Sequence, residues 1–203
     1  MVMAEATNHY FKHLGVSDGL SQVCIPSIYQ DELGAVWLGT TEGLNRYNGK
    51  DVKVFQPSES NHGLTNNEIN ELCGDKNGRM YIRSGNDLIK LDIYTEQFTC
   101  LRQKGVYGLF CKKDTLWVSC ADGIYYYTGQ GTELTFFARV QKGFVGRALY
   151  VDKETVWVVT RKYLVAISRE DPLRQEILLT LDKGNCILGD SSGNIWVGAW
   201  HGL

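Results

Sequence analysis

One sequence unit recurs five times along the 203-residue chain, and this repetition limits the possible folds more than any other feature. The unit is about 40 residues long, and its second apolar segment carries one aromatic residue. These repeat anchors, separated by 44, 36, 40 and 39 residues, are Trp37, Tyr81, Trp117, Trp157 and Trp196. A repeat period of roughly 20–50 residues is typical of solenoids, propellers and similar arrays.

Each unit predicts four short antiparallel strands. In the clearest copy an apolar segment ends at residues 31–34, with the sequence D-E-L-G, and the strand that carries Trp37 follows. Aspartate caps its own turn and glycine adopts the left-handed conformation, so this sequence indicates a hairpin. A second turn and two further strands complete the unit. Four antiparallel strands in about 40 residues is the period of a propeller blade, and we predict an all-β fold.

We predict that residues 1–203 form a single partial β-propeller of about four and a half blades. The complete ring is expected to be seven-bladed, within the roughly 4–8 blades that propellers have. Residues 9–15 are predicted to be the outer strand of the closing blade. A solenoid would show shorter periods, and a sandwich would not repeat the tryptophan. The predicted blades span residues 22–57, 66–101, 105–138, 144–181 and, incomplete, 185–203.

The last unit stops after two of its strands, which predicts that the chain is a piece of a longer protein. An apolar blade face left in water costs ~25 cal/mol per Å², and unpaired strand edges promote association. We therefore expect the isolated chain to associate with other copies or to fray at its end blades. A monodisperse, well-folded monomer in light scattering would contradict this expectation.

Composition excludes several classes of function. A formal charge of −2 and an isoelectric point near 6.1 give no field that attracts nucleic acid. No apolar stretch reaches the ~18 residues of a membrane span, so we expect no direct membrane insertion by this segment. The six cysteines show no C-x-x-C spacing, and we predict neither a metal nor a cofactor. Most are interpreted as small buried hydrophobic residues, and their disulfide state stays open.

The sequence predicts no catalytic residue. Zincin and phosphate-loop motifs are missing from it. Propeller glycosidases use two carboxylates across a cleft, and Asp31, Asp75 and Asp190 are the obvious acidic candidates. Because they occupy equivalent turns in different units, we interpret them as turn caps. The chain is therefore predicted not to be an enzyme.

Ligand binding is predicted at the loops that follow the anchor strands, since these loops vary while the strands keep to the pattern. Aromatic faces stack on sugar rings, and arginine donates to hydroxyls and carboxylates. The predicted ligand-binding residues are Arg83, Arg161 and Trp200. The alternative for the two arginines is a solvated or blade-bridging cation. The alternative for Trp200 is packing against further strands.

The first unit carries the clearest motif, in which D-x-x-G precedes W-L-G-T and then G-L. Its residues are Asp31, Gly34, 37–40 and 43–44. The motif resembles the repeat of the two-component regulator propeller family. The last unit repeats it from Asp190 onward, whereas the intervening units drift, with Tyr81 in place of tryptophan.

This resemblance implies a role as well as a fold. Such propellers form the periplasmic sensor region of hybrid two-component histidine kinases of gut Bacteroidetes, which respond to glycan breakdown products. The implied ligand is an oligosaccharide, and the implied partners are the remaining blades, a second propeller and a second copy of the full sensor. Two alternatives stay open: a protein-interaction scaffold, and a propeller hydrolase or lyase whose carboxylates lie in other blades.

Overall fold

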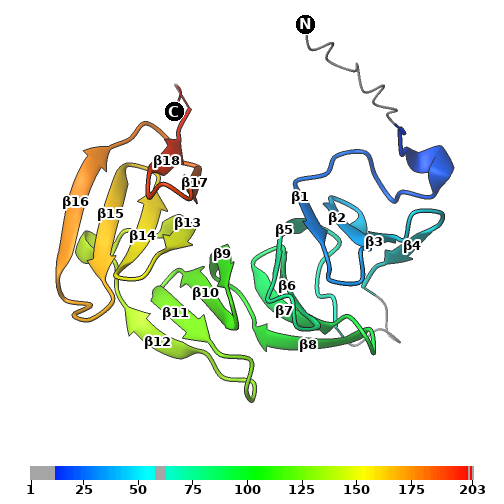
Figure 1. Ribbon diagram of the computed structural model, residues 1–203, viewed down its shortest axis with the longest axis horizontal. Coiled ribbons are helices and arrows are strands. Elements are labelled where there is room, and N and C mark those ends of the chain that lie inside the picture. The colour runs from blue at the N-terminus through cyan, green and yellow to red at the C-terminus, as the bar shows by residue number, and fades with distance from the viewer. Residues whose placement is uncertain (1–11, 58–62, 201, 203) are drawn as a thin grey trace, which may run out of the picture.

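The computed structural model describes residues 12–57, 63–200 and 202. Within them the chain forms four four-stranded antiparallel sheets and one two-stranded sheet. Each sheet is a simple meander in which strands that follow one another in sequence are hydrogen-bonded neighbours. The sheets stand side by side in an arc (Figure 1), which is the arrangement of propeller blades. The predicted all-β propeller is confirmed.

The strands follow the repeat. The first sheet holds β1 (Ser27–Gln30), β2 (Val36–Thr40), β3 (Gly43–Tyr47) and β4 (Val52–Phe55). The second holds β5 (Ile69–Gly74), β6 (Arg79–Ser84), β7 (Asp87–Asp92) and β8 (Gln97–Arg102). The third holds β9 (Val106–Lys112), β10 (Thr115–Cys120), β11 (Gly123–Tyr127) and β12 (Thr135–Ala138). The fourth holds β13 (Gly146–Val151), β14 (Thr155–Thr160), β15 (Tyr163–Ser168) and β16 (Gln175–Thr180). The fifth holds β17 (Cys186–Gly189) and β18 (Ile195–Gly198).

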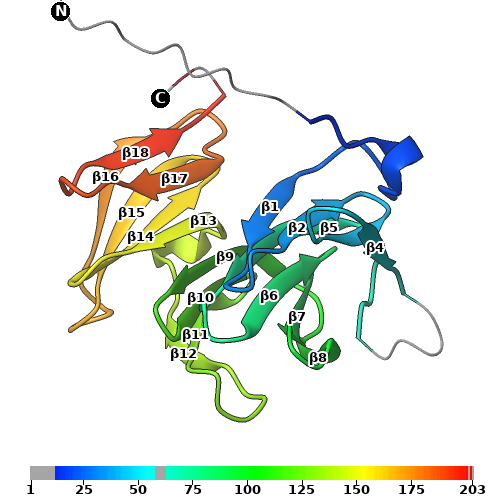
Figure 2. The ribbon, with the colours of Figure 1, turned by 45° about the vertical axis from the view of Figure 1, so that its right-hand side comes forward.

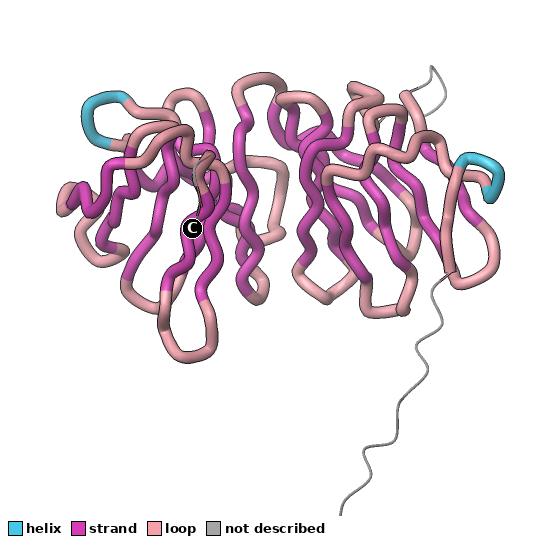
Figure 3. Tube along the Cα trace, turned by 90° about the horizontal axis from the view of Figure 1, so that it is seen from above, coloured by secondary structure: helices cyan, strands magenta, loops and turns pink. Residues whose placement is uncertain are grey.

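The first strand of every sheet lies on the inside of the arc and contacts the first strand of the next sheet (Figure 2). Two short 3₁₀ turns, η1 (Val16–Asp18) and η2 (Gln141–Gly143), lie on the same rim of the arc (Figure 3). Residues 9–11 of the predicted closing strand lie outside the described residues. Residues 12–15 carry no strand in the structure, and their assignment to a closing blade stays a prediction.

The repeated aspartate caps its turn and also holds the anchor. The Asp31 carboxylate accepts from the backbone N–H groups of Leu33 at 3.0 Å and Ala35 at 2.9 Å. Its second oxygen accepts from Trp37 Nε1 at 2.7 Å. Asp75 and Asp190 likewise accept from backbone N–H groups of their own turns. The prediction that these three residues are turn caps is confirmed.

Each buried core cluster joins two successive sheets. One cluster spans the first and second sheets, the next spans the second and third, and the last spans the third and fourth. Trp37 and Tyr81 are fully buried in these seams, and Trp117 is nearly so. Trp157 is partly buried, whereas Trp196 is exposed, with 50% of its surface open to solvent. The anchors of the first three sheets therefore seal the seam to the following blade.

The glycine of the W-L-G-T sequence lets neighbouring blades approach. A Cβ atom placed on Gly39 would lie 2.7 Å from Cγ2 of Ile69 and 3.0 Å from the Ile69 carbonyl oxygen. Because Ile69 begins the first strand of the next sheet, only a hydrogen atom fits between β2 and β5. The motif thus places its smallest residue at a close contact of the first seam.

Candidate ligand-binding site

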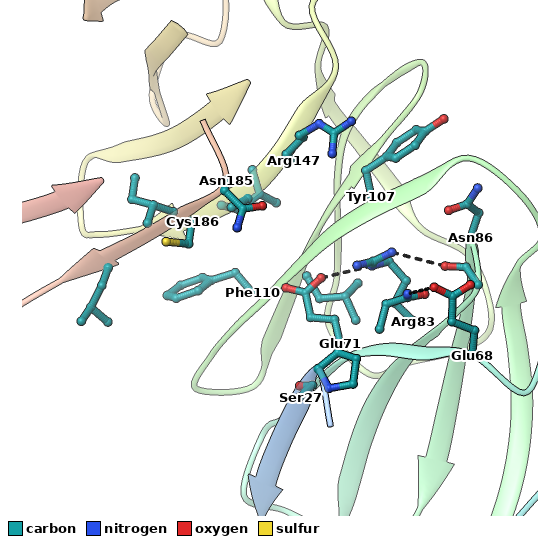
Figure 4. A pocket seen from close by; sticks show the side chains of 18 of the residues that line it. Ser27, Glu68, Glu71, Arg83, Asn86, Tyr107, Phe110, Arg147, Asn185 and Cys186 are labelled. Carbon is teal, nitrogen blue, oxygen red and sulfur yellow. Dashed lines mark hydrogen bonds and ion pairs between the residues drawn. The ribbon is translucent and has the colours of Figure 1, made fainter. Parts of the chain in front are cut away.

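A cavity of about 880 Å³ opens where the first strands of the five sheets face one another (Figure 4). Its position follows from the fold, since the first strand of each blade lies nearest the axis. All five sheets contribute side chains to the wall. One lining residue from each sheet, in chain order, is Ser27, Glu71, Phe110, Arg147 and Cys186. Residues more than 150 positions apart in the sequence therefore share one cavity.

Arg83 lies on this wall, paired with a carboxylate of its own sheet. Arg83 and Glu71 are register partners on β6 and β5, and Arg83 Nε lies 3.3 Å from Glu71 Oε2. Arg83 Nη1 also donates to the Gly85 carbonyl oxygen at 3.3 Å. Burial raises the pKa of Glu71, although the guanidinium of Arg83 and the N–H of Leu109 act against the rise. A fixed cation and a carboxyl with a raised pKa thus stand together at the cavity.

Asn70 also lines this cavity. Its Nδ2 donates to Glu68 Oε1 at 2.7 Å. Its Oδ1 is buried and accepts from no group in the described part of the chain. A buried polar atom without a partner costs about 1–3 kcal/mol.

A smaller hollow of about 380 Å³ lies beside the large cavity. Arg161, from the turn between β14 and β15, and Trp200, which follows β18, both line it. Lys183 Nζ lies 4.7 Å from the centre of the Trp200 ring. Arg147 lines this hollow and the large cavity alike. Two of the three predicted binding residues therefore lie together, and Arg83 lies apart from them in the larger cavity.

Sequence reasoning missed several residues of the cavity wall. Glu71, Tyr107 and Arg147 stand near the starts of first strands rather than in the loops after the anchors. Their signal in the sequence is a glycine that recurs in the loop before these first strands, as Gly105 lies before Tyr107. This glycine is recognisable from the repeat, but the repeat alone does not show that the strand behind it faces the axis.

Two further observations concern residues 12–57, 63–200 and 202. No group of three or more His, Cys, Asp or Glu side chains among them is placed to hold a metal ion. No helix formed by these residues has the length and apolar character needed to cross a membrane.

The chain resembles known proteins at both the sequence and the structural level. Residues 19–42 match the family described as Two component regulator propeller. They form a two-component regulator propeller repeat. The match covers the turn and the anchor strand of the first blade, and it confirms the family predicted from the D-x-x-G and W-L-G-T sequences. Over 53 residues the chain is 40% identical to Histidine kinase P4 of Formosa agariphila. These 53 residues make up 26% of this chain and 4% of that protein.

Solved structures share the arrangement of these sheets. The extracellular domain of a putative hybrid two component system from B. thetaiotaomicron has a TM-score of 0.81 at 22% identity, covering 93% of this chain and 29% of that one. The extracellular domain of a putative one component system from the same organism has a TM-score of 0.76 at 19% identity, covering 94% and 30%. A gluconolactonase from Xanthomonas campestris has a TM-score of 0.63 at 13% identity, covering 85% and 68%.

At these identities the likeness shows the fold alone, and a fold that also carries a gluconolactonase does not by itself decide function. The chain spans less than a third of each B. thetaiotaomicron domain. The site must therefore carry the functional argument.

Proposed function

We propose that this chain is part of the periplasmic, non-catalytic sensor region of a hybrid two-component histidine kinase and that its central cavity binds an oligosaccharide. Three findings support the proposal. The first is the regulator propeller repeat at residues 19–42. The second is the similarity to a histidine kinase. The third is the fold shared with extracellular domains of two-component and one-component systems.

The observation that carries the proposal is the chemistry of the central cavity. Its volume falls within the roughly 300–1,000 Å³ of small-molecule sites. Phe110 and Tyr107 offer aromatic faces to it, and Arg83 and Asn70 offer polar atoms. A sugar ring has apolar C–H faces and a rim of hydroxyl groups, so this combination of groups suits it.

Such a site would signal through interfaces rather than through chemistry. A ligand that touches first strands of several blades binds best to one relative placement of those blades. Binding then favours the arrangement of the complete sensor that has this placement. In the complete receptor the change would pass to a second propeller or to a second copy as a rigid-body shift at their interface.

A glycan panel tests the proposal on the intact protein that contains this chain. We expect at least one oligosaccharide to raise the melting temperature, and Tyr107→Ala to weaken its binding about tenfold through lost stacking. Tyr94→Ala removes an exposed tyrosine that does not line the cavity, and it should leave affinity unchanged. Binding of no sugar would contradict the proposal. Capture of a protein partner would favour the scaffold, and release of shortened glycan would favour the hydrolase or lyase.

A further inference from the structure

Cys73 and Cys111 occupy a position that recurs at the seams between blades. The residue paired with the repeat anchor across the sheet is Tyr29 on β1, Cys73 on β5, Phe110 on β9 and Tyr150 on β13. At the first and fourth seams this residue is a tyrosine that packs against a glycine of the next sheet. A Cβ atom on Gly74 would lie 2.2 Å from the Tyr29 hydroxyl oxygen, and one on Gly189 would lie 2.1 Å from the Tyr150 ring.

The seam between the second and third sheets departs from this pattern at both positions together. Cys73 takes the place of the tyrosine, because it pairs with the anchor of its own sheet. Cys111 takes the place of the glycine, because both Cys111 and Gly74 pair with the residue just before the anchor. Their Sγ atoms lie 2.8 Å apart, closer than two unbonded sulfur atoms ordinarily approach. The other cysteines, at positions 24, 100, 120 and 186, have no such neighbour in the described part of the chain.

We propose that Cys73 and Cys111 form a disulfide that links the inner strands of two neighbouring blades. The tyrosine–glycine contact of the first and fourth seams is missing here, and a covalent link between two small side chains would close the same gap. The first strands β5 and β9 would then be joined beside the cavity, because Glu71 and Phe110, which precede the two cysteines, both line it.

The chemistry is a thiol–disulfide exchange with a disulfide oxidant. One cysteine thiolate attacks a sulfur of the oxidant and forms a mixed disulfide, releasing one thiolate of the oxidant. The second cysteine then displaces the other thiolate, so two protein thiols and one oxidant disulfide become one protein disulfide and two free thiols. Burial raises the pKa of the Cys73 thiol. Slow alkylation of the reduced pair is therefore expected, since the thiolate is the reactive form.

Peptide mapping tests the link directly. The native protein is equilibrated with oxidised glutathione, quenched with N-ethylmaleimide and digested with trypsin without reduction. The peptides 54–76 and 105–112 each contain one cysteine, and we expect them as a linked pair. Cys24→Ser and Cys186→Ser, which change exposed cysteines, should keep the pair. Full alkylation of Cys73 and Cys111 after oxidation, or linkage of either to another cysteine, would overturn the proposal.

A double variant separates the link from the packing. Cys73→Tyr with Cys111→Gly recreates the contact of the first and fourth seams, so we expect this variant to fold. Adding dithiothreitol should lower the melting temperature of the parent protein by several degrees and leave that of the double variant unchanged. An equal response of both proteins would also count against the disulfide.

A separate observation, the charge of the smaller hollow, deepens the proposed function and rests on it. Arg147, Arg161 and Lys183 converge on the hollow, although the whole chain carries a formal charge of −2. In the described part of the chain none of these three cations is in an ion pair. We infer that the ligand is an acidic oligosaccharide whose carboxylate or sulfate ester lies at these cations while a sugar ring lies against Trp200.

Matched sugars test this inference in the intact protein. The carboxylate arm compares digalacturonic acid with its methyl ester, and the sulfate arm compares a sulfated galactan disaccharide with its desulfated form. We expect one acidic sugar to bind at least tenfold more tightly than its neutral match, and the difference to shrink as salt is raised. Arg161→Gln should remove most of the difference, whereas Lys153→Gln, in the turn at the opposite end of the same sheet, should not.

The outcomes separate this inference from the proposed function. Binding of a neutral sugar with no preference for its acidic match would overturn the acidic ligand and leave the sugar sensor standing. Binding of no sugar of either kind would overturn both.

Discussion

The Asp31 carboxylate links a turn to a blade seam. It is buried, and it accepts from two backbone N–H groups of its turn and from the indole of Trp37. The fourth and fifth sheets repeat the bond between aspartate and indole, from Trp157 to Asp152 at 2.7 Å and from Trp196 to Asp190 at 3.0 Å. One side chain thus fixes both the hairpin and the orientation of the ring that fills the seam.

Replacing Asp31 by alanine should therefore destabilise the protein far more than the same change at Asp190. Asp31→Ala leaves buried N–H donors without their acceptor, and we expect the free energy of unfolding to fall by roughly 2–4 kcal/mol. The Asp190 turn is exposed to solvent, and water replaces the lost acceptor there. Urea unfolding of the two variants measures the contrast, and equal losses would show that the Asp31 bonds add nothing to a surface turn.

Acid should weaken the fold through Asp152. Burial acts to raise the pKa of Asp152, but hydrogen bonds from Trp157, Glu154 and Thr155 outweigh it and the pKa is lowered. A carboxyl with a lowered folded-state pKa adds stability above its unfolded pKa of about 3.9, and this stability is lost as pH falls through the folded value. As pH falls below about 4, the melting temperature should drop more steeply for the parent than for Asp152→Asn. Parallel curves would contradict this assignment.

At the scale of strands, the spacing between β2 and β5 depends on Gly39. Gly39→Ala places a methyl group 2.7 Å from a side-chain carbon of Ile69, so the two strands must separate. We expect a loss of about 1–3 kcal/mol in the free energy of unfolding, the usual result of overpacking. Gly15→Ala is a matched control, since its methyl group would lie 3.8 Å from its nearest neighbours, and it should be close to neutral.

The strands and turns were predictable because the same sequence unit occurs five times. D-x-x-G turns and anchor spacing locate the hairpins without any tertiary information. The cavity wall was less predictable, since its residues lie where the repeat drifts. Arg83 stands two residues after Tyr81, where Gly39 stands after Trp37, and Glu71 pairs with it across the sheet. Such pairs depend on the strand register and on which strand faces the axis, and neither can be inferred from the sequence of a single unit.

At the scale of the whole molecule, the proposed ligand should protect segments that are distant in sequence. Hydrogen exchange with and without a bound sugar should slow at the starts of β5, β9, β13 and β17, which wall the central cavity. The outer strands β4, β8 and β12 should exchange unchanged. Protection confined to a single loop would contradict a site built by several blades.

The three core clusters, each shared by two successive sheets, have a consequence for how the molecule tolerates change. Because each seam is sealed only by its own two units, a destabilising substitution at one seam has a local effect. The changes in unfolding free energy caused by substitutions at distant seams are therefore additive. The exposed turns that carry Arg161 and Trp200 belong to none of these clusters. Recognition can therefore be rewritten along the rim while the interior keeps its packing, so related chains could diverge in what they detect without refolding.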